Sequence, residues 1–112
     1  MDSRLSDLSI EDHIWRVKLY RKIRDYIRLK KNLSYYEVKE DERTRPDLLS
    51  FRAYGYVELR WLVVLVANND DEFSPLPVGY ALPLPPIQEV RSLIREVREE
   101  YASSKVQFRA QR

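Results

Sequence analysis

The chain lacks cysteine altogether, and among its 112 residues it has only two glycines and one histidine. The absence of cysteine excludes disulfide bonds, thiolate zinc sites and a cysteine nucleophile. The two glycines form no glycine-rich phosphate loop, and His13 has no neighbours at the spacing of metal ligands or of a Ser-His-Asp set. We therefore expect a protein that is not an enzyme and binds no cofactor or metal, with His13 on the surface of a helix.

Long hydrophobic runs are also missing. The first residues carry charges at Asp2, Arg4 and Asp7, with no uninterrupted apolar run behind them, which is unlike a signal peptide. The most apolar stretch, residues 57–67, is far shorter than the roughly 20 residues that a membrane-spanning helix needs. We expect a cytosolic product with no membrane span.

The charges nearly balance, because 20 basic residues face 18 acidic ones and leave a net charge of +2. This balance argues against a dedicated nucleic-acid binder. The charges are nevertheless segregated: residues 16–31 hold eight basic side chains and the single acid Asp25, whereas residues 37–42 and 70–72 are acidic. Patches of opposite sign steer association, so they favour head-to-tail contacts with copies or neighbours. Pairing within the chain is equally allowed.

The centre of the chain, residues 33–86, begins with a predicted strand and a short helix. Residues 35–39 concentrate aromatic and β-branched side chains between charges, which is typical of a strand. Thr44 then offers a capping oxygen, and Pro46 suits the first helical turn because its missing amide would have no partner there. We expect the helix to end at Gly55, where a left-handed cap costs glycine least.

A buried helix and a second strand complete this centre. Residues 57–67 are apolar except for Glu58 and Arg60, and a helix that is apolar on nearly every side must be buried. Residues 80–85 return as an extended segment, in which two prolines leave at least one edge unpaired. The order strand, helix, helix, strand predicts a small α+β protein with a β-α-α-β core.

The N-terminal region, residues 1–32, supports two interpretations. We expect residues 1–9 to be flexible until bound, and the pair Ser9 and Asp12 resembles a helix start. Apolar residues at helical spacing then predict a helix over residues 10–24. The alternative is extended structure at the end of this region, with residues 25–30 pairing in a hairpin with residues 34–39.

The C-terminal region, residues 87–112, begins with an amphipathic helix. Ile87, Val90, Ile94, Val97 and Tyr101 recur at spacings of three and four, and charged residues fill the other faces. A stripe of little more than two heptads is too short for an independent coiled coil. We expect it to lie against this domain or against a neighbouring subunit, followed by a polar, basic tail over residues 102–112.

The central motifs resemble one protein family as a combination. They are Arg45-Pro-Asp-Leu-Leu-Ser-Phe-Arg-Ala-Tyr-Gly55, the apolar helix with Trp61, Asn68-Asn69, and Leu76-Pro-Val-Gly-Tyr-Ala-Leu-Pro-Leu-Pro85. This pattern resembles the LysM-like baseplate wedge subunits of contractile phage tails and related contractile injection systems. The resemblance covers about half of the chain, and it implies a LysM-like core at residues 33–86.

The resemblance also implies a function. The expected role is a structural virion protein, a clamp or adaptor between wedge proteins, present in several copies in the tail baseplate and assembled in the host cytoplasm with other wedge and hub proteins. The side chains that we expect at protein interfaces are Arg21, Arg24, Arg28, Tyr36, Tyr54, Tyr56, Tyr80, Val90, Ile94 and Val97.

Two other functional classes stay open. One is a LysM-type module that binds peptidoglycan or chitin in the groove between its helices and the loop after the second. The other is a nucleic-acid-binding accessory protein that uses Arg21, Lys22, Arg24, Arg28, Lys30 and Lys31.

Two acidic clusters complete the candidates. Residues 70–72 could bind a hard cation such as calcium, but they contain no glycine to wrap a loop around an ion and are equally ordinary turn residues. We expect both this cluster and residues 40–42 to be solvated loops.

Overall fold

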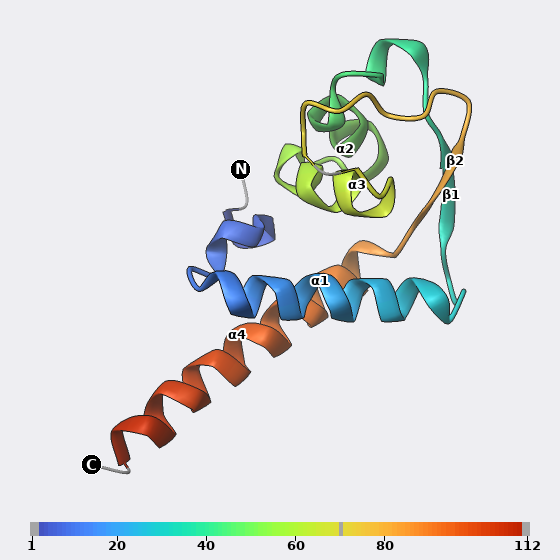
Figure 1. Ribbon diagram of the computed structural model, residues 1–112. Coiled ribbons are helices and arrows are strands. Elements are labelled where there is room, and N and C mark those ends of the chain that lie inside the picture. Colours follow the sequence, from blue (N-terminus) through green and yellow to red (C-terminus); the bar gives the residue numbers. More distant parts are fainter. Residues whose placement is uncertain (1–2, 70, 111–112) are drawn as a thin grey trace.

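The computed structural model describes residues 3–69 and 71–110. In chain order its main elements are α1 (His13–Arg28), β1 (Ser34–Glu37), α2 (Pro46–Tyr54), α3 (Arg60–Val66), β2 (Ala81–Leu84) and α4 (Ile87–Ala110). Single-turn 3-10 helices lie at Ser3–Leu5, Asp7–Ser9, Glu40–Glu42 and Val57–Leu59. The order β1-α2-α3-β2 and the α+β class are confirmed (Figure 1).

The two strands form an antiparallel ladder, in which Ser34 pairs with Leu84 and Glu37 with Ala81. Beyond the ladder the Gly79 amide donates to the Val38 carbonyl at 2.8 Å. The two strands run beside α2 and α3, and their lower ends lie near the C-terminal end of α1 (Figure 1). The predicted hairpin between residues 25–30 and 34–39 is wrong, because β1 pairs with β2 and the first of those segments ends α1.

Helix α1 begins later than predicted. Asp12 caps it, since one carboxylate oxygen accepts hydrogen bonds from the Ile14 amide at 2.8 Å and the Trp15 amide at 3.4 Å. Before it, residues 3–9 form two 3-10 turns, and both Leu5 and Ile10 are buried. The expectation of a flexible segment is therefore wrong for residues 3–9, while Met1 and Asp2 lie outside the described residues.

The boundaries of α2 follow from a proline at its start and a glycine at its end. Pro46 is its first residue, as predicted, but the residue before it is Arg45, which gives no side-chain cap, so the predicted cap at Thr44 is wrong. At the other end Gly55 has φ +83°, which confirms the left-handed cap, and its amide donates to the Phe51 carbonyl at 2.7 Å.

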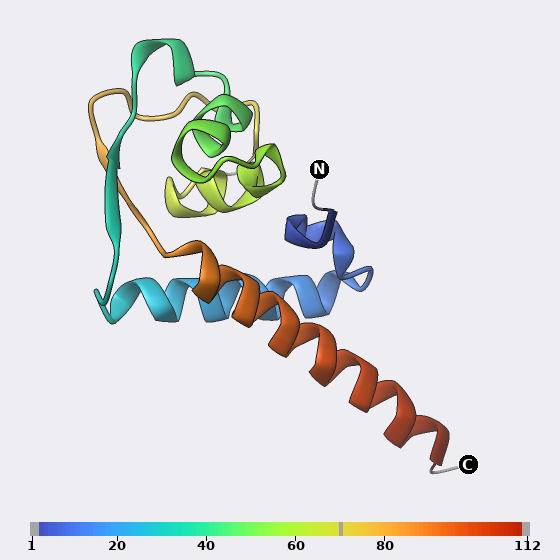
Figure 2. The same ribbon diagram turned by 180° about the vertical axis from the view of Figure 1, so that it is seen from behind.

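Helix α4 is longer than the stripe suggested, because the predicted polar tail is helical through Ala110. It crosses α1 and then extends past the rest of the molecule (Figure 2), which measures 55 × 28 × 25 Å along its principal axes. At the crossing Lys22 binds Glu96 at 2.8 Å and Glu100 at 3.4 Å. None of the helices in the described part of the chain is both long and apolar enough to cross a membrane.

Apolar side chains are buried in two clusters. The three-segment cluster consists of Leu5, Ile10, Leu19, Ile23, Leu59, Trp61, Leu62, Val90, Ile94 and Val97. The β-unit cluster consists of Val38, Leu49, Val63, Leu76, Leu82 and Leu84. Helix α3 contributes to both clusters, because Leu62 lies in the first and Val63 in the second.

Candidate interaction surfaces

The basic face of α1 is exposed, as the sequence indicated. Arg21, Arg24 and Arg28 follow one another at spacings of three and four, so they share one side of the helix. They line an open hollow of about 570 Å³. The single acid of this helix, Asp25, lies 3.5 Å from Arg28 and offsets only part of the charge. This face presents positive charge to any neighbour.

The four predicted interface tyrosines do not share one situation. Tyr80 is 63% exposed and open to a partner. Tyr36 and Tyr54 are half-buried and occupied, because Tyr36 donates to the Glu42 carboxylate at 2.6 Å and Tyr54 to the Pro85 carbonyl at 2.7 Å. Burial raises the pKa of Tyr36, with the bond to Glu42 adding to it, and burial raises the pKa of Tyr54.

Tyr56 and the exposed Tyr35 complete the aromatic set. The Arg91 guanidinium lies over the half-buried Tyr56 ring, 5.4 Å from its centre, so α4 already covers this tyrosine. Tyr35, which is not among the predicted interface residues, is 64% exposed. It lies three residues before the buried Val38, and this odd spacing places it on the opposite face of the strand. The alternation along a strand is the signal that could have found it.

The apolar stripe of α4 is not a surface for partners. Val90, Ile94 and Val97 are 0%, 3% and 0% exposed and pack in the three-segment cluster. Their assignment to a protein interface is therefore wrong. The stripe finds its apolar partners in α1, where Leu19 and Ile23 belong to the same cluster.

The acidic segment before α2 contains a buried carboxylate. Glu42 is fully buried and accepts hydrogen bonds from the Lys39 amide at 2.8 Å, the Tyr36 hydroxyl at 2.6 Å and Arg52 at 3.1 Å. The expectation of a solvated Glu42 is wrong, because these three donors replace its water. Asp41 is exposed, and the Arg52 guanidinium hydrogen-bonded to it lowers the pKa of Asp41.

The loop after α3 uses its polar side chains to hold its own backbone. Asp71 accepts from the Phe73 and Ser74 amides, each at 2.9 Å, and Glu72 binds Arg60 at 3.0 Å. Asp70 lies outside the described residues. Across residues 3–69 and 71–110, no group of three or more carboxylates or histidines is placed to hold a metal ion. His13 is exposed at the first residue of α1.

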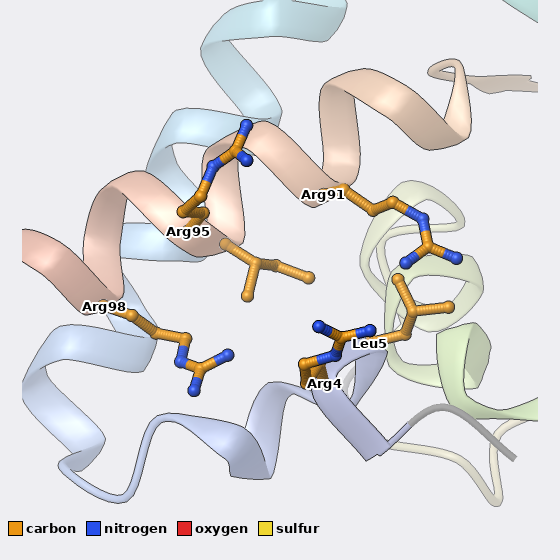
Figure 3. Close-up of a pocket in the computed structure, with 6 residues that line it drawn as sticks. Arg4, Leu5, Arg91, Arg95 and Arg98 are labelled. Carbon is orange, nitrogen blue, oxygen red and sulfur yellow. The ribbon is translucent and has the colours of Figure 1, made fainter.

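One charged site was not anticipated. Arg4, Arg91, Arg95 and Arg98 line a hollow of about 190 Å³ together with Leu5 and Ile94 (Figure 3). The spacing of the three arginines on α4 is visible in the sequence and predicts that they share a face. That Arg4 joins them could not be seen, because it depends on how the N-terminal turns dock against α4.

Comparisons of this chain with protein-family models, with curated proteins and with solved structures each found no match. The site geometry and the sequence motifs therefore carry the functional argument.

Proposed function

We propose that this chain is a structural subunit of the baseplate wedge of a contractile tail, in which residues 33–86 form a LysM-like β-α-α-β core. The observation that carries the proposal is that the motif residues behind the resemblance occupy the turning points of this core. Pro46 opens α2, Gly55 closes it at φ +83°, and Gly79 turns the chain into β2 at φ +81°. Asn68, at the end of α3, also has a positive φ of +58°.

The surfaces described above support a clamp or adaptor role. The arginines of α1 form one exposed charged face, Tyr80 and Tyr35 present aromatic area, and α4 extends beyond the compact part of the molecule. Half-exposed tyrosines and arginines are enriched where proteins meet. On this proposal the partners are other wedge and hub proteins of the same particle, several copies are present in each, and the location is the virion tail.

Incorporation into tail particles tests the proposal. The double variant Arg21→Glu and Arg28→Glu should reduce the amount of subunit that co-purifies with assembled tails, because it reverses the charge of a contact face, and the difference from wild type should be largest at low salt and shrink as salt screens the contact. Arg43→Glu with Lys31→Glu is the matched control, since it makes the same change of charge at other exposed positions. Incorporation of both variants at wild-type stoichiometry would remove the α1 face from the proposal, and absence of the wild-type subunit from purified tails would end it.

The glycan-binding alternative gives a different result. Titration of the isolated protein with soluble muropeptides or chitin oligomers should show no saturable binding if the role is assembly. Trp61, the tryptophan of the predicted core, is only 8% exposed, and its ring nitrogen donates to the Leu5 carbonyl at 2.8 Å. It therefore presents no open face on which a sugar ring could stack.

A further inference from the structure

We infer that the outer edge of β1 pairs with the same edge of a second copy of this chain, so that two copies build one antiparallel sheet of four strands. Within residues 3–69 and 71–110 the sheet has two strands, β1 and β2, and the outer edge of each has no neighbouring strand. Such an edge is a template for pairing with another chain. The inference stands on the geometry of this edge and goes beyond the proposed function.

The peptide groups of β1 alternate between β2 and the outer edge. The Val38 amide donates to the Tyr80 carbonyl at 3.0 Å, and the ladder continues in register from this pair. Hydrogen-bonded pairs alternate with non-bonded pairs in an antiparallel ladder. The peptide groups of Tyr36 therefore face β2, and those of Tyr35 and Glu37 face away from it. The outer edge of β1 offers the amides and carbonyls of these last two residues.

The outer edge of β2 is closed by comparison. Pro83 lies opposite Tyr35, at a position that faces away from β1, and a proline has no amide to donate there. Proline is one of the residues that keep edge strands from pairing with other chains. Strand β1 contains no proline, and three of its four residues are exposed. Of the two edges, that of β1 is the open one.

The surroundings of β1 leave room for another strand and set its limit. The ladder forms one margin of the molecule, and no helix of the described residues lies beyond it in either view (Figures 1 and 2). At the far end the Lys39 amide donates to the Glu42 carboxylate at 2.8 Å, and the Lys39 carbonyl accepts from the Glu42 amide at 3.0 Å. A partner strand can therefore bond the outer edge only up to Glu37.

One register makes the best use of this short edge. When Tyr35 of each copy lies opposite Glu37 of the other, both residues exchange hydrogen bonds, about four between the copies. Sliding by two residues in one direction places Glu37 opposite its own counterpart, and like charges directly opposite are destabilising. Sliding in the other direction places Glu37 opposite Leu33, which lies before the ladder.

The charges at the two ends of β1 make the edge complementary to itself. Residues 28–31 hold three basic side chains, whereas residues 37–42 hold four acids and one lysine. Arg52 pairs with two of these acids, and Glu37 and Glu40 are exposed. An antiparallel second copy brings the basic end of each strand beside the acidic end of the other, because a two-fold contact repeats itself. This complementarity assigns the edge to a second copy of the chain.

Sedimentation velocity on the full chain tests the inference. A contact of this size belongs to the weak class of interfaces, so the series should run from about 0.02 mM to about 1 mM protein. Wild type should form a dimer that dissociates on dilution and weakens as salt rises. Tyr35→Pro removes an outward amide without touching the bonds to β2, and it should weaken dimerisation about tenfold or more.

Ala81→Pro is the matched control, because it removes the outward amide of β2 instead and should leave the dimer affinity within about twofold. Circular dichroism of both variants should match wild type. A wild type that stays monomeric over the whole series would overturn the inference, and so would equal weakening by the two proline variants.

Disulfide trapping tests the register without a proline. The chain has no cysteine of its own, so single-cysteine variants report one position each. A mixture of Tyr35→Cys and Glu37→Cys should cross-link on mild oxidation faster than either variant with itself, because opposite residues of a hydrogen-bonded pair lie about 5.5 Å apart between Cα atoms, within the range of a disulfide. A size tag on one variant identifies the mixed product.

Ala81→Cys, at an equally exposed position on β2, is the control for random collision. Cross-linking of the mixture no faster than that of Ala81→Cys would contradict pairing through β1, whatever the proline variants do.

Tail incorporation of the Tyr35→Pro variant separates the two proposals. If this variant is monomeric and is still incorporated normally, the β1 dimer stands and is not needed for assembly. If wild type stays monomeric but is found in tails, the β1 dimer falls and the proposed function stands.

Discussion

The two apolar clusters differ in how much of the chain they draw together. The β-unit cluster takes its members from Val38 to Leu84, all within the predicted core. The three-segment cluster takes its members from Leu5 to Val97 and joins side chains from all three regions that the sequence suggested as separate. Helices α1 and α4 are therefore not appendages of a central domain. They supply half of the buried members of a second core that the central unit alone lacks.

Helix α3 links the clusters, and this link predicts how the molecule unfolds. Its neighbouring residues Leu62 and Val63 are both fully buried, one in each cluster. Since neither cluster can lose its packing without disturbing this helix, we expect one cooperative transition rather than two.

The largest effects should come from truncating one residue in each cluster. Trp61→Ala should lower the free energy of unfolding by about 3–5 kcal/mol and Leu82→Ala by about 2–5 kcal/mol, because each leaves a cavity. Trp61→Ala also deprives the Leu5 carbonyl of its donor. Chemical denaturation followed by far-ultraviolet circular dichroism, which reports helix content, and by hydrogen exchange should show a single shifted transition in each variant. Two transitions, of which only one moves, would contradict the link through α3.

A smaller loss is expected at the buried carboxylate. Glu42→Ala should cost about 3 kcal/mol, because the Tyr36 hydroxyl and the Lys39 amide lose their acceptor in a buried place. Glu42→Gln keeps one acceptor oxygen and should cost about 1 kcal/mol. Glu40→Gln, on the exposed neighbour, should change stability by no more than about 0.5 kcal/mol. Thermal melts of the three variants measure how their losses of stability rank. Equal losses would show that the buried Glu42 carboxylate does not stabilise this part of the fold.

The two glycines offer a matched pair with a still smaller cost. Gly55 and Gly79 have φ of +83° and +81°, and an added Cβ would meet nothing within 4 Å at either position. Any loss in Gly55→Ala or Gly79→Ala therefore reports backbone strain alone, about 1–2 kcal/mol each. Denaturant midpoints of both variants measure it. A much larger loss for Gly55 would indicate that its turn couples the two clusters more tightly than packing suggests.

The smallest effect is a dependence on alkaline pH. Burial raises the pKa of both Tyr20 and Tyr54 far above 10.0, their ordinary value, and for Tyr20 the hydrogen bond to Asp7 adds to the effect. Because the folded-state pKa is raised, the stabilisation is fully present below about pH 10 and is lost as pH rises above it. A tyrosinate absorbance titration should show Tyr20 and Tyr54 ionising later than the exposed tyrosines, with the pKa of Tyr36 also raised. Tyr20→Phe and Tyr54→Phe should each remove one of them, and an unchanged late amplitude would contradict the assignment.

Local patterns predicted the central elements well. The aromatic and β-branched residues before residue 40, together with Pro46 and Gly55, each act through the backbone of their own segment, so their consequences could be predicted without a tertiary structure. The apolar stripe of α4 was visible for the same reason. The surface against which this stripe packs could not be predicted from the sequence. Because the stripe packs with side chains of α1, deleting α4 would remove three core side chains rather than a detachable flank.

The remaining errors have one physical origin. Leu5 and Ile10 precede α1 and lie among polar residues, yet both are buried in a cluster whose other members extend to Val97. The burial of Glu42 depends on Arg52, which only a folded α2 brings near. The same limit applies to the arginine-lined hollow between α4 and the N-terminal turns, because helical spacing aligns Arg95 with Arg98 but says nothing of Arg4.

The span of the two clusters also has a consequence for synthesis on the ribosome. The β-unit cluster is complete once Leu84 has emerged, whereas the three-segment cluster must wait for Val97. At about 5–20 residues per second this delay is on the order of one to a few seconds. During it, Leu5, Leu19 and Trp61 have no α4 to cover them. The nascent chain is then most exposed to misassociation, and we expect chaperones to be needed in that interval.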